Sequence, residues 1–111
     1  MEIRQLTDGV AVAGQITPTD IPVLAAQGFK SLVCNRPDGE SPDQPNFADV
    51  ESAAKNMGIE IRYIPIYPGM MSLDDVHAFR AALNEMPQPL LAYCRSGARS
   101  TTLFDAAQSR V

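Results

Sequence analysis

Residues 90–102 read LLAYCRSGARSTT, and this stretch decides the fold because it joins a strand, a tight loop and a helix. Leu90 to Tyr93 form a short apolar run after two prolines, which is typical of a buried strand. A polar loop containing Gly97 follows, and the helix behind it is predicted to begin at about Ser100 and to continue through residues 109–111. The stretch therefore predicts a strand–loop–helix unit whose loop carries Cys94.

The rest of the sequence alternates between strand-like and helix-like segments. The patterns predict strands at 9–16, 30–34 and 59–65, and helices at 17–28, at 47–57 and behind a capping box that begins at Ser72. Strands that alternate with helices indicate an α/β fold with a mainly parallel sheet between helices. In such a sheet, ligands bind where strands end and loops lead into helices. We therefore expect Cys34, Cys94 and the long polar loop 35–45 at that edge.

Length and composition exclude several classes of function. The chain has 111 residues, and we expect one domain, either complete or one module of a longer protein. Nine basic and thirteen acidic residues argue against nucleic-acid binding, and no apolar run approaches a membrane span. The first residues do not resemble a signal peptide, so a cytoplasmic protein is expected. Two cysteines and one histidine predict neither a metal site nor a cofactor.

The loop after Tyr93 has the features of an anion site with a reactive thiol. Successive backbone N–H groups and a helix N-terminus favour an anion, and Arg99 adds a forked guanidinium. The same groups should lower the pKa of Cys94 and make its thiolate the nucleophile. The predicted anion-binding residues are Arg95, Ser96, Gly97, Ala98, Ser100 and Arg36. The alternative is an ordinary strand–turn–helix with a small core cysteine.

Two resemblances follow from these residues. The pattern Cys-x-x-Gly-x-Arg at 94–99 resembles the active-site loop of rhodanese-type sulfurtransferases. Cysteine phosphatases use a similar loop, but with arginine six residues after the cysteine and usually histidine before it. Here the arginine comes five residues after Cys94, and Tyr93 precedes it.

The whole chain resembles the bacterial family of beta-lactamase-hydrolase-like, phosphatase-like domains. The matching segments are 14–18, 34–40, 63–66 and 91–100. The resemblance implies a fold like the dual-specificity phosphatases. In some relatives the domain is fused to a metallo-hydrolase of the persulfide-dioxygenase type, so the resemblance also implies a role in sulfide metabolism. We therefore expect a metallo-hydrolase of this type as a fused or separate partner.

Two features favour sulfur transfer over phosphate hydrolysis. A loop one residue shorter makes a narrower cradle, and the loop 67–72 has no carboxylate to protonate a leaving oxygen. Asp38 is the candidate acid if phosphate is the substrate. The sequence thus predicts a sulfurtransferase that forms a persulfide on Cys94, with a phospho-cysteine phosphatase and a non-catalytic binding module as alternatives. The predicted substrate is thiosulfate, glutathione persulfide or a phosphate ester, and Arg95 would attract such anions.

Overall fold

The computed structural model describes residues 1–108 and contains one five-stranded sheet. The strand order is β1-β2-β5-β3-β4, and all neighbours are parallel except β1 and β2. The strands are β1 (Ile3–Thr7), β2 (Val10–Ala13), β3 (Ser31–Cys34), β4 (Glu60–Tyr63) and β5 (Leu90–Tyr93). The predicted α/β class with a mainly parallel sheet is therefore confirmed.

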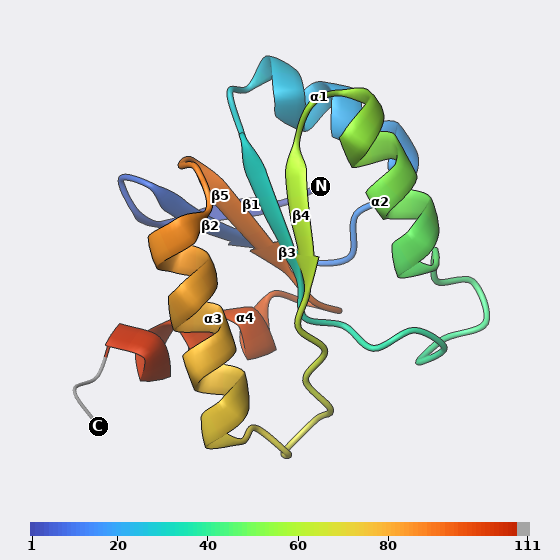
Figure 1. Cartoon of the computed structure of the whole chain (residues 1–111). Helices are drawn as coiled ribbons and strands as arrows, with labels where there is room; N and C mark the ends of the chain where they lie inside the picture. Colours follow the sequence, from blue (N-terminus) through green and yellow to red (C-terminus); the bar gives the residue numbers. More distant parts are fainter. Residues whose placement is uncertain (109–111) are drawn as a thin grey trace.

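Helices cover both faces of the sheet and make two separate cores. The helices are α1 (Ile21–Ala26), α2 (Phe47–Asn56), α3 (Leu73–Glu85) and α4 (Ala98–Gln108), and the short 3-10 helix η1 (Pro18–Asp20) precedes α1. Figure 1 shows α3 and α4 on the face of the sheet opposite to α1 and α2. Leu24, Val50 and Tyr93 belong to one core, whereas Phe79 and Leu103 belong to the other. Within residues 1–108, no helix is long and apolar enough to cross a membrane.

The N-terminal part of the sheet differs from the expectation. A single strand at 9–16 was expected, but the structure has a β1–β2 hairpin that turns at Asp8 and Gly9. Asp-Gly is a strong hairpin signal, but β1 has no buried residue and so lacks the apolar alternation that marks a half-buried strand. It is the antiparallel edge of the sheet.

The helices begin close to the expected positions. Ser72 caps α3 by accepting the Asp75 N–H at 3.2 Å, and the Asp75 carboxylate accepts the Ser72 N–H at 3.0 Å, which confirms the capping box. Helix α4 begins at Ala98, two residues earlier than expected. The expectation that this helix continues through residues 109–111 lies outside the described residues.

Candidate active site

Cys94 directly follows β5, is separated from α4 by the loop residues 95–97, and is fully buried. Its N–H donates to the Ala13 carbonyl at 3.3 Å, which continues the pairing of β5 with β2. Its Sγ accepts the Gly97 N–H at 3.0 Å. Gly97 has a φ of 93°, and a Cβ there would lie 3.4 Å from the Ala13 carbonyl, so a side chain would strain this turn. The backbone therefore holds a donor on the thiol.

Burial and hydrogen bonding act in opposite directions on Cys94. Burial raises the pKa of the Cys94 thiol, but hydrogen bonds from the N–H groups of Ser100, Ser96 and Gly97 outweigh it and leave the pKa lowered. The Ser100 hydroxyl donates its single proton to Asn35 Oδ1 at 2.8 Å, so we attribute the effect mainly to the backbone donors. The loop thus favours a thiolate, as its sequence predicts.

Cys34 has the opposite environment. It ends β3, is buried, and donates its S–H to the Arg36 carbonyl at 3.3 Å. Burial raises the pKa of the Cys34 thiol, and the neighbouring Tyr93 hydroxyl and Arg36 backbone, which lower this pKa, do not offset the burial. Of the two cysteines, only Cys94 is poised as a nucleophile.

This difference gives a testable prediction for alkylation by iodoacetamide. Both thiols are almost fully buried, so the difference in rate should come from the fraction of thiolate rather than from exposure. At neutral pH we expect Cys94 to react faster than Cys34, because the pKa of the Cys94 thiol is lowered and that of the Cys34 thiol is raised. Peptide mapping of the alkylated, folded protein measures both rates. Equal rates would contradict an activated Cys94.

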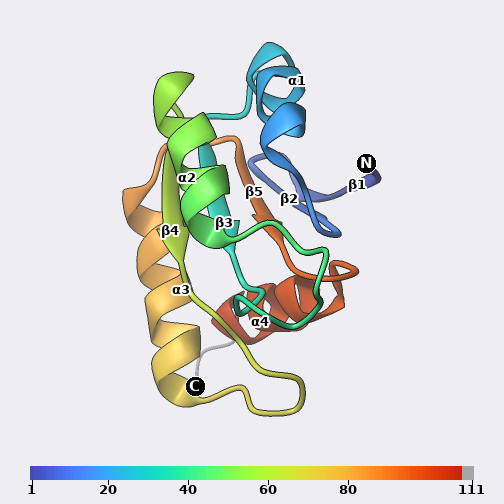
Figure 2. The same cartoon turned by 90° about the vertical axis from the view of Figure 1, so that its right-hand side faces the viewer.

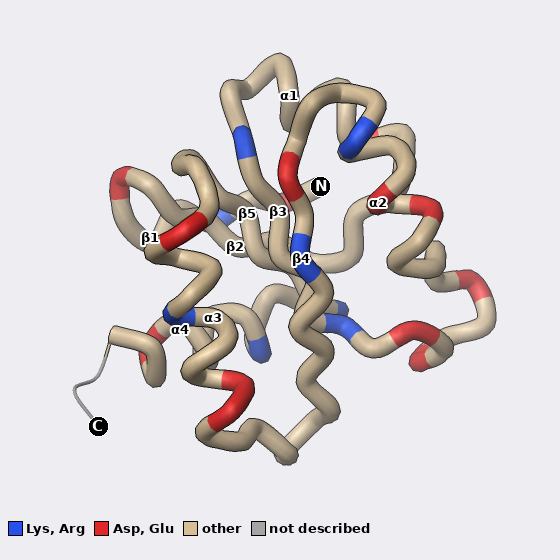
Figure 3. Tube along the Cα trace, in the orientation of Figure 1, with Lys and Arg blue, Asp and Glu red and all other residues tan. Residues whose placement is uncertain are grey.

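Arg99 is held by a carboxylate that the sequence patterns did not single out. Its Nη1 and Nη2 donate to the two oxygens of Glu40 at 2.7 and 2.8 Å, and Nη1 also donates to the Ile66 carbonyl at 2.8 Å. Arg36 Nε donates to Glu40 as well, at 3.0 Å. Glu40 therefore joins two arginines, and Figure 3 shows acidic and basic positions close together at this edge of the sheet.

These contacts determine which part of the Arg99 guanidinium stays free. A guanidinium has five N–H donors, and the bonds to Glu40 and Ile66 use both donors of Nη1 and one of Nη2. Nε and the second donor of Nη2 share one edge, which is used by neither Glu40 nor Ile66 and is open to the Cys94 thiolate or to a ligand. An electrostatic interaction also joins Arg99 to Cys94, so the arginine lies beside the thiol. A two-donor edge next to a thiolate suits an oxyanion or a developing negative charge.

The ion pair is intact at neutral pH. Hydrogen bonds from Arg99, and then those from Arg36, lower the pKa of Glu40 below the ordinary carboxyl range, although burial opposes them. The pKa of Arg99 is raised, mainly by the hydrogen bond to Glu40. Because the carboxyl pKa is lowered in the folded state, the stability that this pair contributes is present above the ordinary carboxyl pKa. It is lost as pH falls through the lowered value.

Asp38, the candidate acid, has a structural contact instead. Its Oδ1 accepts the Phe47 N–H at 2.8 Å at the start of α2, and its own N–H donates to the Tyr63 hydroxyl at 3.0 Å. The carboxylate thus satisfies a free N–H group of a helix N-terminus. Its use as an acid stays a prediction, and nothing in these contacts directs it to Cys94.

A pair of substitutions separates the two roles of Asp38. Asp38→Ala removes the acceptor for Phe47, and we expect it to lower the free energy of unfolding by about 1 kcal/mol. Asp38→Asn keeps an acceptor oxygen but has no acidic proton, so it should cost less stability and retain sulfur transfer. Urea denaturation and turnover assays measure the two effects. A fall of about 10²-fold or more in the turnover of Asp38→Asn would instead identify an acid.

The other predicted residues surround the loop in different ways. Arg36 contacts protein groups, because Nη1 donates to Gln15 Oε1 at 3.1 Å while Nε binds Glu40. The Ser96 hydroxyl accepts a hydrogen bond from the Ala98 N–H at 3.3 Å, and this bond lies within the turn that leads into α4. Direct anion binding by Arg36, Ser96 and Ala98 stays a prediction.

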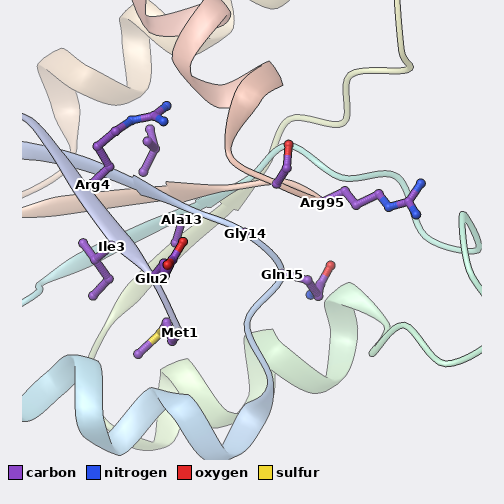
Figure 4. Close-up of a pocket in the computed structure, with 10 residues that line it drawn as sticks. Met1, Glu2, Ile3, Arg4, Ala13, Gly14, Gln15 and Arg95 are labelled. Atoms are coloured by element: carbon purple, nitrogen blue, oxygen red, sulfur yellow. The ribbon is translucent and has the colours of Figure 1, made fainter.

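Arg95 lies at the rim of the site. It is exposed, and Figure 4 shows its side chain pointing away from Met1 and Ile3 of the N-terminal segment. Arg95 borders a hollow of about 740 Å³, and the lining of this hollow also includes Arg4, Gly14, Gln15 and Ser96. The sequence thus locates the loop correctly. It missed Glu40, whose only local signal was its place four residues after Arg36.

Comparisons with known proteins agree with this arrangement. The family model described as "Beta-lactamase hydrolase-like protein, phosphatase-like domain" matches residues 2–111. A beta-lactamase hydrolase-like protein of Agrobacterium fabrum is 36% identical over 104 residues, which are 94% of this chain and 24% of that protein. The chain therefore spans about a quarter of the length of this relative.

Solved structures of proteins described as phosphatases share this fold. A candidate phosphatase from Neisseria meningitidis is 32% identical with a TM-score of 0.87, over 94% of this chain and 74% of that one. The core catalytic domain of a PP-IP phosphatase from S. cerevisiae is 14% identical with a TM-score of 0.64, over 98% of this chain and 77% of that one. The second likeness shows the fold alone. The predicted dual-specificity-phosphatase-like fold is confirmed.

Proposed function

Because the chain belongs to the family of phosphatase-like domains of beta-lactamase hydrolase-like proteins, we propose that it is a cysteine enzyme whose Cys94 accepts a sulfane sulfur atom. Cys94 is the nucleophile, and Arg99 with the surrounding N–H groups binds the anionic donor. The fold and the family support a cysteine enzyme of the phosphatase type. The choice of sulfur as the transferred atom rests on the shape of the loop.

The observation that carries this choice is the spacing of five residues from Cys94 to Arg99. The Gly97 N–H donates to the thiol itself, and the N–H groups of Ser96 and Ser100 face it closely enough to lower its pKa. A loop that is one residue shorter than the phosphatase loop leaves fewer donors for the three outer oxygens of a phosphoryl group. A single sulfur atom, bound end-on to Cys94, needs less room and fewer donors.

The carboxylates around the site support the same choice. The loop between β4 and α3 has none from Tyr67 to Ser72, and Asp38 and Asp75 cap the starts of α2 and α3. An alkyl phosphate needs a proton on its leaving oxygen, and general acid catalysis is worth about 10²–10⁴-fold. Sulfite and thiolates are stable leaving groups that need no proton.

The reaction balances without a cofactor. The Cys94 thiolate attacks the outer sulfur of thiosulfate, the S–S bond of the donor breaks, and its electron pair leaves with sulfite. The product on the protein is a Cys94 persulfide anion, Cys–S–S⁻. An acceptor thiolate or cyanide then attacks the outer sulfur and regenerates the Cys94 thiolate. Arg99 stabilises negative charge in both steps.

Phosphate-ester hydrolysis through a phospho-cysteine is the second candidate. The comparisons taken alone favour it, since the family is described as phosphatase-like and the solved neighbours include phosphatases. In this reaction Cys94 attacks phosphorus, the alkoxide leaves with a proton from an acid, and water hydrolyses the phospho-cysteine. Asp38 would be the acid, after leaving its contact with Phe47.

One experiment with two arms distinguishes the candidates. Purified protein is incubated with thiosulfate or glutathione persulfide, and separately with an aryl phosphate. Intact-protein mass spectrometry and a phosphate assay read the two arms. We expect the mass of one added sulfur atom and little phosphate release. Absence of the adduct, together with rapid release of phosphate, would establish the phosphatase. Absence of both would leave a non-catalytic anion-binding module.

A further inference from the structure

A second hollow borders Arg99 and shares no lining residue with the hollow that Arg95 borders. Its volume is about 360 Å³, and Ile66, Gly69, Met71, Ala98, Arg99 and Thr102 line it. The first three residues belong to the segment between β4 and α3, and the others to the first turns of α4. Figure 2 shows this segment running from the end of β4 to the start of α3.

The lining of this second hollow is mostly apolar, and Arg99 is its one charged residue. The Thr102 hydroxyl donates to the Ala98 carbonyl at 3.1 Å and is therefore satisfied within its own helix. The Ile66 carbonyl is likewise occupied by Arg99 Nη1. Apart from Arg99, the lining therefore offers few polar groups that could bind a polar group of a ligand. The hollow beside Arg95 differs, because Glu2, Arg4 and Gln15 line it.

The segment that forms one wall also exposes large apolar side chains. Tyr67, Met70 and Leu73 are 59, 72 and 62% exposed. Met71, between them, is only partly exposed and packs against the core formed by α3 and α4. Apolar surface that continues from a hollow to its surroundings is typical of a binding site rather than of a solvated loop.

We propose that this hollow binds the apolar group of a small monoanion whose charged end is held by Arg99. The ligand class is an aryl or short-alkyl compound with one anionic head, such as an aryl thiosulfonate. Arg99 is the point at which the charged and the apolar parts of such a ligand meet. Its Nε–Nη2 edge takes the head, and the lining with Met71 and Thr102 takes the ring.

The inference rests on the proposed function for the identity of the sulfur donor, but anion binding can be measured without turnover. With benzenethiosulfonate, the Cys94 thiolate takes the outer sulfur, the S–S bond breaks, and benzenesulfinate leaves with the electron pair. The donor and the leaving group carry one negative charge each, so charge balances. The thiosulfate reaction differs only in the group attached to the outer sulfur.

The first test measures how well two sulfonates protect Cys94 from iodoacetamide. Benzenesulfonate and methanesulfonate carry the same head, but only the first has a ring for the hollow. We expect benzenesulfonate to protect at a concentration about tenfold lower, because burial of even part of a ring is worth this much in affinity. Met71→Ser should reduce the preference to about threefold or less. Met70→Ser, on the same segment but outside the lining, is the matched control and should keep it.

A second variant covers the case in which Met71→Ser does not fold. Thr102→Gln, at an exposed position of α4, puts a longer polar side chain into the hollow. It should remove the preference for benzenesulfonate and leave protection by methanesulfonate unchanged. Equal protection by the two sulfonates in the unmodified protein would overturn the inference.

Turnover of benzenethiosulfonate and thiosulfate then separates this inference from the proposed function. A preference in protection without sulfur transfer from either donor would retain the hollow as a binding site and refute the sulfurtransferase. Sulfur transfer from both donors at equal kcat/KM, with equal protection, would retain the sulfurtransferase and refute the apolar subsite. A higher kcat/KM for benzenethiosulfonate that Met71→Ser lowers selectively would support both.

Discussion

Replacing Cys94 by serine is expected to abolish sulfur loading and to lower turnover by about 10⁴-fold or more, as loss of a catalytic nucleophile does in other covalent enzymes. A serine hydroxyl is not ionised at neutral pH and cannot form a persulfide. Serine is close to cysteine in size, and the Gly97 N–H can donate to its oxygen as it does to Sγ. We therefore expect the variant to fold.

The control for this variant is Cys34→Ser. Cys34 donates to the Arg36 carbonyl, and a serine hydroxyl can keep that hydrogen bond, so the buried site stays satisfied. Loading and turnover should stay close to those of the unmodified protein. Mass spectrometry after incubation with thiosulfate reads both variants in one experiment. An adduct that persists in Cys94→Ser and disappears in Cys34→Ser would show that the nucleophile was assigned wrongly.

Replacing Arg99 by lysine is expected to lower kcat/KM by about 100-fold, although the charge is unchanged. Lysine cannot donate to Glu40, the Ile66 carbonyl and a substrate anion in the fixed directions of the guanidinium. The loss of charge-assisted hydrogen bonds to a substrate, each worth about 1.5–3 kcal/mol, gives this magnitude. Steady-state kinetics with thiosulfate measures it.

Replacing Glu40 by glutamine removes the Arg99–Glu40 ion pair by changing its acidic member. Glutamine leaves the Nε–Nη2 edge of Arg99 present but less well oriented, so a smaller loss of about tenfold is expected. Because glutamine does not titrate, the variant should also lose the part of the acid sensitivity of stability that the lowered pKa of Glu40 confers. Equal losses for Glu40→Gln and Arg99→Lys would mean that Arg99 acts only through Glu40 and touches no substrate.

Features that depend on neighbouring residues were accessible from the sequence. Strand β5 has the predicted bounds, because a run of four apolar residues between prolines and a polar loop has few alternatives. The capping box at Ser72 and Asp75 and the loop from Cys94 to Arg99 were predicted for the same reason. Each requires certain residue types at short, set spacings. The predicted class of chemistry, an activated cysteine in an anion-binding loop, rests on this local pattern.

Features that depend on long-range contacts were decided by the tertiary structure. Glu40 reaches Arg99 across 59 positions of the chain, since parallel strands bring the ends of β3 and β5 to one edge. The tertiary structure also brings the Asp38 carboxylate to the first N–H of α2, which donates to it. It likewise brings Asn35 close enough to accept a hydrogen bond from the Ser100 hydroxyl. A carboxylate can pair with an arginine, cap a helix or donate a proton. Which of these it does depends on the donors that the fold brings within hydrogen-bonding distance, and the local sequence does not contain that distance.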